Sequence, residues 1–194
     1  MTTITQPTTH TLDVPGATIA YDVRRNATTT EPILLLIGSP MGASGFGTLA
    51  GHFADRTVVT YDPRGAERSQ KTDPASKSTP ADHADDLHRL IQALDAGPVD
   101  LFATSGGAVN ALALVERHPA QVRTLVAHEP PLLAILPDRE AALAATRDIH
   151  DTYMRAGVTM DPVMNNANWT QRIHSDQPNE IGVGIDGTST NLGL

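Results

Sequence analysis

Runs of mostly apolar residues alternate along this chain with segments in which apolar residues recur at helical spacing. Such runs are typical of strands that are buried on both faces of a parallel sheet. They predict strands over residues 33–38, 56–62, 99–105 and 122–131. Residues 10–26, "HTLDVPGATIAYDVRRN", predict two further strands joined by a turn at Pro15-Gly16.

The clearest helical pattern is an apolar stripe formed by Leu87, Leu90, Ile91 and Leu94. Thr79 is a suitable N-cap for this helix, Pro80 suits its first position, and Gly97 suits its end. Further helices are predicted over 44–54, 106–118 and 137–157, whereas the polar segment 66–79 predicts a loop. Strands that alternate with helices predict an α/β fold, with a mainly parallel sheet covered by helices on both faces.

Composition narrows the possible classes of protein. The 194-residue chain contains no cysteine, which excludes disulfides and thiolate metal sites, and its net charge of −8 disfavours nucleic acid and anionic membranes as partners. The start of the chain lacks the basic and apolar blocks of a signal peptide, and no apolar run approaches about 20 residues. We therefore expect a cytoplasmic protein without a membrane or nucleic-acid partner.

Ser105 stands where a predicted strand ends and a small-residue helix begins. The following glycines, Gly106 and Gly107, allow the chain to turn sharply, and they place an amide N–H at a helix N-terminus beside the serine hydroxyl. This arrangement is typical of a nucleophile elbow, although the G-x-S-x-G pattern has Ala103 at its first position. The alternative is a tight turn in which Ser105 only caps the helix.

Four segments in order extend this pattern: "LLLIGSP", "YDPRGAERS", "FATSGGAVNALALVERHP" and "VRTLVAHEPPLL". Together they resemble the α/β-hydrolase superfamily, in its esterase and haloperoxidase-like branch, over about residues 10–156. The resemblance implies that Ser105 is the nucleophile and that the backbone N–H groups of Ser39 and Gly106 form an oxyanion hole. Ile37 departs from the family's usual histidine. A serine nucleophile disfavours the epoxide hydrolase and dehalogenase branches. The expected substrate is a small ester or a related acyl compound, and the expected reaction needs no cofactor or metal.

The resemblance also implies an acid and a histidine base later in the chain. Glu129 is a candidate acid, although it is equally compatible with a carboxylate at the cleft rim, and His174 is a candidate base. His128 is expected to point away from Glu129 because side chains alternate along a strand. Because the family's base follows strands that this sequence does not reach, we expect a hydrolase core shortened at its C-terminus.

The expected division is an N-terminal core part over 1–156 and an atypical tail over 157–194. Without later strands, residues 122–129 would form an exposed edge, which we expect to be covered by the tail through "IGVGID" or by a second chain in a homodimer. The tail could also serve as a lid or be partly disordered. The alternative to a serine hydrolase is an inactive hydrolase-like module that binds a ligand or a partner.

Two smaller features carry predictions of their own. Asp62 and Arg64 in "YDPRG" are expected to form a turn-stabilising pair near the active edge of the sheet. Met41 and Phe46 are expected to line an acyl pocket or to belong to the core.

Overall fold

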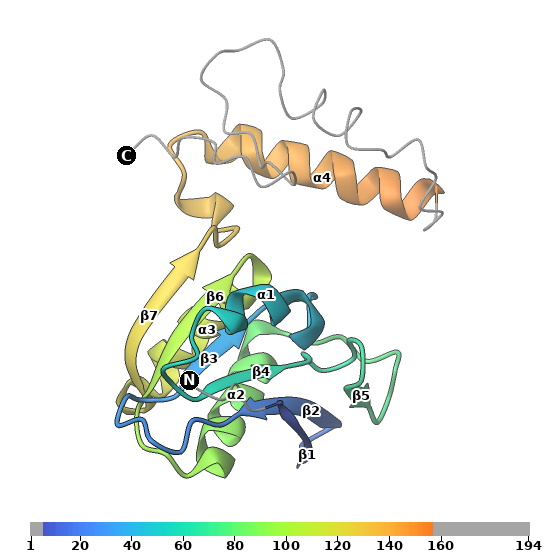
Figure 1. The fold of residues 1–194 in the computed structure, drawn as a ribbon. Helices are drawn as coiled ribbons and strands as arrows, with labels where there is room; N and C mark the ends of the chain where they lie inside the picture. The colour runs from blue at the N-terminus through green and yellow to red at the C-terminus, as the bar shows by residue number, and fades with distance from the viewer. Residues whose placement is uncertain (1–5, 157–194) are drawn as a thin grey trace. The chain divides into compact units, whose positions relative to one another are not determined.

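The computed structural model describes residues 6–156, and the chain divides into two compact units, Met1–Pro131 and Leu132–Leu194. The described part of the first unit contains a seven-stranded sheet in the order β1-β2-β4-β3-β6-β7, with β5 paired to β2 (Figure 1). Its strands are β1 Thr8–Val14, β2 Ala17–Arg24, β3 Leu34–Ile37, β4 Val58–Tyr61, β5 Gln70–Lys71, β6 Val99–Thr104 and β7 Val122–His128.

Parallel pairing joins β4, β3, β6 and β7, whereas β1 and β2 form an antiparallel hairpin. Gly16 turns this hairpin with a φ of 78°, a left-handed conformation that glycine adopts without steric cost. The α/β fold class and the mainly parallel sheet are confirmed. Only β5 falls in a segment that was predicted to be a loop.

Helices follow the predicted alternation. They are α1 Gly47–Gly51, preceded by the 3₁₀ turn η1 Ala43–Phe46, then α2 Pro80–Leu94, α3 Gly106–Arg117 and α4 Arg139–Ala156, with further 3₁₀ turns η2 Pro119–Gln121 and η3 Leu133–Ile135. Thr79 caps α2 as predicted: its hydroxyl accepts the Asp82 N–H and the Asp82 carboxylate accepts the Thr79 N–H. The end of this helix was predicted wrongly, because Asp95, with a φ of 47°, forms the C-cap and Gly97 lies beyond it.

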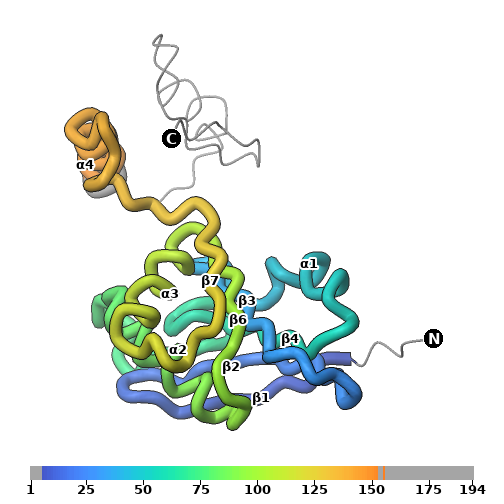
Figure 2. Tube along the Cα trace, turned by 90° about the vertical axis from the view of Figure 1, so that its left-hand side faces the viewer, coloured from blue at the N-terminus to red at the C-terminus, as the bar shows by residue number. Residues whose placement is uncertain are grey.

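The two faces of the sheet bury alternate residues of the same strand. Leu35 and Ile37 of β3 join a large apolar cluster with residues of α2 and α3, whereas Leu34 and Leu36 join a smaller cluster with residues of η1 and α1. Figure 2 shows α2 and α3 on one side of the sheet and α1 on the other. Covering both faces explains why the β3 run contains no polar residue.

The second unit contributes η3 and α4 to the described residues. Thr146 donates its hydroxyl to the carbonyl of Ala142 within α4, and Ile135 of η3 is 75% exposed. No helix in the described part of the chain combines the length and the apolar character needed to cross a membrane.

β7 forms one edge of the described sheet and is paired there with β6 alone. Within the described residues no strand pairs with its other side, and Val126 is 52% exposed. The proposed cover, residues 157–194, lies outside the described residues, so coverage of this edge by the tail or by a second chain stays a prediction.

Asp100, near the start of β6, connects the edge strand to the centre of the sheet through ion pairs. Arg123 of β7 donates from Nε to Asp100 Oδ1 at 2.7 Å, and Arg56 donates to Oδ2 at 2.7 Å. The hydrogen bonds from Arg123, and then those from Arg56, lower the pKa of Asp100 to about 2, although burial opposes them.

Because the pKa of Asp100 is about 2 in the folded chain and near 3.8 when unperturbed, its stabilising contribution is present above about pH 4 and is lost as the pH falls toward 2. Asp100→Asn should therefore lower the free energy of unfolding by about 1–2 kcal/mol near neutral pH. Urea unfolding of both proteins across this range measures the difference. If the difference in unfolding free energy between the two proteins stayed constant down to pH 2, the stabilising role of the ionised Asp100 carboxylate would be contradicted.

Candidate active site

Ser105 occupies a strained turn between β6 and α3. Its backbone has a φ of 54° and a ψ of −129°, a region that non-glycine residues rarely adopt. The Ser105 N–H donates to the carbonyl of His128 on the neighbouring strand, and its carbonyl accepts the N–H of Ala108 as the helix begins. The residue is exposed, and its side chain makes no capping hydrogen bond to the helix. The hydroxyl is therefore not used as a helix cap.

Gly106 and Gly107 allow the start of α3 to approach the end of β3 closely. A Cβ on Gly106 would lie 2.8 Å from the Ser39 carbonyl oxygen, and a Cβ on Gly107 would lie 2.6 Å from the Ile37 carbonyl oxygen. Both distances are shorter than those that real Cβ atoms show. The two glycines thus place Ser39 directly beside the turn that carries Ser105.

The segment Gly38–Ser44 runs from the end of β3 into the first residues of η1, and we call it the oxyanion loop, after the role predicted for Ser39. It begins at the carboxyl end of β3, and its Ser39–Pro40 peptide bond is cis. A Cβ on Gly38 would lie 2.5 Å from the Met41 carbonyl oxygen, so the loop folds back tightly on its own first residue. The structure therefore brings together Ser39, Gly106 and Ser105, three residues whose proximity the sequence predicted.

Met41 and Phe46 have different surroundings. Phe46 is 2% exposed and belongs to the apolar cluster on the α1 side of the sheet. Met41 is 38% exposed, and its side chain lies against Gly38 and Gly45 of the same loop region. Phe46 is therefore a core residue, whereas Met41 is partly exposed, and its role in an acyl pocket stays a prediction.

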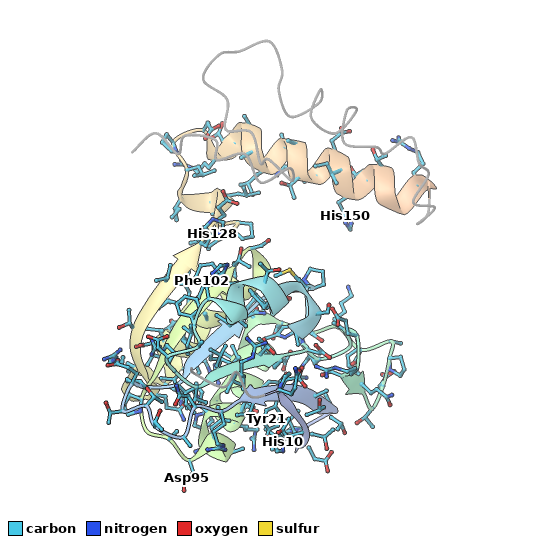
Figure 3. The ribbon with its side chains drawn as sticks, viewed as in Figure 1. His10, Tyr21, Asp95, Phe102, His128 and His150 are labelled. Atoms are coloured by element: carbon cyan, nitrogen blue, oxygen red, sulfur yellow. The ribbon has the colours of Figure 1, made fainter. Side chains whose placement is uncertain are left out.

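His128 and Glu129 lie at the end of β7, beside the end of β6. His128 pairs in register with Thr104, and its Nδ1 lies 3.1 Å from the Thr104 hydroxyl oxygen. The imidazole also stacks on Phe102, with ring centroids 6.0 Å apart (Figure 3). Glu129 is exposed and has a φ of 48°, so a second strained residue directly follows β7, the strand whose last carbonyl accepts the Ser105 N–H.

No histidine contacts the Ser105 hydroxyl within the described part of the first unit. The Ser105 side chain forms no hydrogen bond there, and His128 is bonded instead to Thr104. The candidate base, His174, lies outside the described residues. The described site thus holds the candidate nucleophile, two amides and one carboxylate.

Asp62 and Arg64 do not pair with each other, so this part of the sequence prediction is wrong. Asp62 is fully buried and accepts hydrogen bonds from Arg68 Nε at 2.6 Å and from the Ala43 N–H at 2.8 Å. Arg64 instead makes a bidentate contact with Asp86 of α2 at 2.7 and 2.6 Å. Burial raises the pKa of Asp86, and the hydrogen bonds from Arg64 oppose this shift. Each arginine fixes the loop after β4 to a different neighbour.

Comparison with protein families identifies the fold. The alpha/beta hydrolase fold family matches residues 31–171, which is most of the chain. The chain therefore belongs to the alpha/beta hydrolase fold family.

Two curated relatives carry hydrolase names. A protein of Bacillus subtilis (strain 168) named uncharacterized hydrolase YraK is 42% identical over 132 residues, which cover 67% of this chain and 47% of the relative. A proline iminopeptidase of Xylella fastidiosa (strain Temecula1 / ATCC 700964) is 32% identical over 97 residues, which cover 50% and 31%. The chain thus spans about half or less of the length of these relatives.

Solved structures agree with this assignment of the fold. A mutant of a Pseudomonas aeruginosa protein, provisionally described as an epoxide hydrolase, has a TM-score of 0.65 at 22% sequence identity. The similarity covers 89% of this chain and 60% of that chain. At this identity, the comparison supports the fold and not the reaction.

Replacing Gly107 by alanine tests the close approach of α3 to β3. The new Cβ would clash with the backbone at Ile37, so Gly107→Ala should lower the free energy of unfolding by about 1–3 kcal/mol. The control is Gly51→Ala in α1, where a Cβ meets nothing within 4 Å and stability should be unchanged or slightly higher. Chemical unfolding measures both. Equal stabilities for the two variants would show that the approach is not tight.

Proposed function

We propose that this chain carries the acylation site of a serine hydrolase that cleaves small esters through an acyl-enzyme on Ser105. The observation that carries the proposal is the strained, exposed turn at Ser105, held beside Gly106 and Ser39. A conformation of this kind persists only where the surroundings enforce it, and it is common at active sites. Membership in a family with hydrolase relatives agrees with the proposal.

In the proposed reaction, the Ser105 hydroxyl oxygen attacks the ester carbonyl carbon while a base takes its proton. The carbonyl oxygen becomes an oxyanion that accepts hydrogen bonds from the N–H groups of Ser39 and Gly106. The tetrahedral intermediate then collapses, the C–O bond to the alcohol breaks, and the alcohol leaves with the proton. Water attacks the acyl-enzyme in the same way, which releases the acid and regenerates Ser105.

The remaining roles complete this proposal. His174 is proposed as the base and Glu129 as the carboxylate that orients it, because the order serine, acid, histidine is the usual one in this fold. Glu129 stands at the end of β7, and the carbonyl of His128, its neighbour in the chain, accepts the Ser105 N–H. A serine at the turn also favours acyl transfer over epoxide opening, which in the relatives of this fold uses an aspartate.

A second function has one observation in its favour. Because no histidine of the described first unit contacts the Ser105 hydroxyl, the chain could bind ester-like ligands at the same turn without hydrolysing them. The two functions differ in whether the serine oxygen forms a covalent bond. A mechanism-based probe therefore distinguishes them.

A fluorophosphonate probe should label the folded chain on Ser105 and should fail to label Ser105→Ala. p-Nitrophenyl acetate should give a burst of nitrophenol that disappears in the same variant. Even without an efficient base, an intact oxyanion hole leaves about 10³–10⁴-fold acceleration over water.

The control for this experiment is Ser78→Ala, an exposed loop serine that should not change labelling or the burst. Mass spectrometry of the labelled peptide identifies the modified residue. If the folded wild type is not labelled by the probe, the proposal of a serine hydrolase is contradicted. Ligand binding without hydrolysis is then the function that remains.

A further inference from the structure

Glu67 stands in an unfavourable backbone conformation between β4 and β5. Its φ is 45°, in the left-handed region that favours glycine. Of the described residues, those other than glycine with positive φ are Glu67, Asp95, Ser105 and Glu129. Asp95 caps a helix, and Ser105 and Glu129 lie at the proposed active site. Glu67 lies in a turn closed by the hydrogen bond from the Ser69 N–H to the Ala66 carbonyl, and its side chain makes contacts beyond this turn.

The Glu67 carboxylate is bonded to the oxyanion loop. Its Oε1 accepts the backbone N–H of Gly42 at 3.2 Å and the hydroxyl of Ser44 at 2.8 Å. A Cβ on Gly42 would lie 2.9 Å from the same Oε1 and 2.6 Å from Asp62 Oδ1. Because Gly42 has no side chain, the carboxylates of Asp62 and Glu67 can both approach the loop and accept its hydrogen bonds.

The two carboxylates contribute differently. Asp62 is fully buried and accepts hydrogen bonds from the Ala43 N–H and from Arg68, so its contact with the loop is part of the folded core. Glu67 is exposed, and it reaches the loop from solvent. Gly42 is buried, so without Glu67 its N–H would lack the acceptor that the structure provides.

A short series of contacts leads from Glu67 to the proposed oxyanion hole. Gly42 follows Met41, and the carbonyl oxygen and side chain of Met41 lie close to Gly38. Gly38 precedes Ser39, whose carbonyl oxygen lies against Gly106. A displacement of Gly42 would therefore move the peptide that carries the Ser39 N–H relative to the turn at Ser105.

We infer that Glu67 is a positioning residue that holds the oxyanion loop in place, so that the Ser39 N–H faces the ester carbonyl oxygen attacked by Ser105. This inference rests on the proposed function. Its physical basis is that an oxyanion donor acts only when it is already aimed at the developing charge. Because that charge forms in the transition state, loss of Glu67 should reduce kcat and leave KM nearly unchanged.

Three substitutions at position 67 distinguish an effect of the carboxylate's hydrogen bonds from an effect of the positive φ alone. Glu67→Gln keeps an oxygen acceptor, Glu67→Ala removes the acceptor and keeps the left-handed strain, and Glu67→Gly removes both. If the carboxylate positions the loop, glutamine should retain the acylation rate within about threefold, while alanine and glycine should each lower it about tenfold. If only the backbone conformation mattered, glycine would match or exceed the wild type and glutamine would resemble alanine.

Amide hydrogen exchange at Gly42 gives a readout that does not depend on activity. Its exchange should be at least about tenfold faster in the alanine and glycine variants and close to wild type in the glutamine variant. The matched control is Asp95→Gly, which relieves a similar φ of 47° at the end of α2. Figure 3 shows Asp95 on the far side of the first unit from His128, so this variant should change neither exchange at Gly42 nor acylation.

The acylation rate is measured as the rate of fluorophosphonate labelling and of the nitrophenol burst. Unchanged Gly42 exchange in Glu67→Gly overturns the inference, and so does a rate loss that appears in glutamine as strongly as in alanine. A wild type that does not label overturns the proposed function and the catalytic part of the inference. In that case, exchange at Gly42 still decides whether Glu67 holds the loop.

Discussion

The close contact between the start of α3 and the end of β3 is the constraint on which the proposed site depends. It exists because Gly106 and Gly107 present no Cβ to the carbonyl oxygens of Ser39 and Ile37. Ser105, at the turn between strand and helix just before this contact, has a φ of 54° and a ψ of −129°. One steric condition thus brings Ser39 of the loop after β3 beside the turn that carries Ser105.

Two carboxylates from the end of β4 and the segment after it are hydrogen-bonded to the loop that carries Ser39. Asp62 is buried and Glu67 is exposed, and both accept hydrogen bonds from the loop that follows β3. The loop would otherwise be held at its start by β3 and by its own fold-back on Gly38. The site is therefore assembled from three adjacent strand ends, β4, β3 and β6, which is where ligands bind in open α/β sheets.

The sequence was sufficient to predict the parts of the fold that depend on local patterns. The parallel strands were recognisable because their runs are mostly apolar, without any polar residue in β3, and the cap of α2 was recognisable because Thr79 and Asp82 stand three residues apart. The turn at Ser105 was predictable because two glycines follow a strand. β5 was missed because two polar residues at the sheet margin carry no apolar signal.

Partners that meet only in the folded chain were not predictable in this way. Asp62 was expected to pair with Arg64, two residues away, but it binds Arg68, and Arg64 binds Asp86 of a later helix. The positive φ of Glu67 also gave no signal, because glutamate is not a residue that predicts a left-handed turn. The candidate base lies beyond the described residues, and its role rests on chain order alone.

The most direct test of the account is a crystal structure of the chain after reaction with a small phosphonate, which mimics the tetrahedral intermediate. The account predicts a covalent bond to the Ser105 hydroxyl oxygen, with the phosphoryl oxygen about 2.7–3.1 Å from the backbone nitrogens of both Ser39 and Gly106. A phosphoryl oxygen that points to solvent, with neither amide in reach, would contradict it.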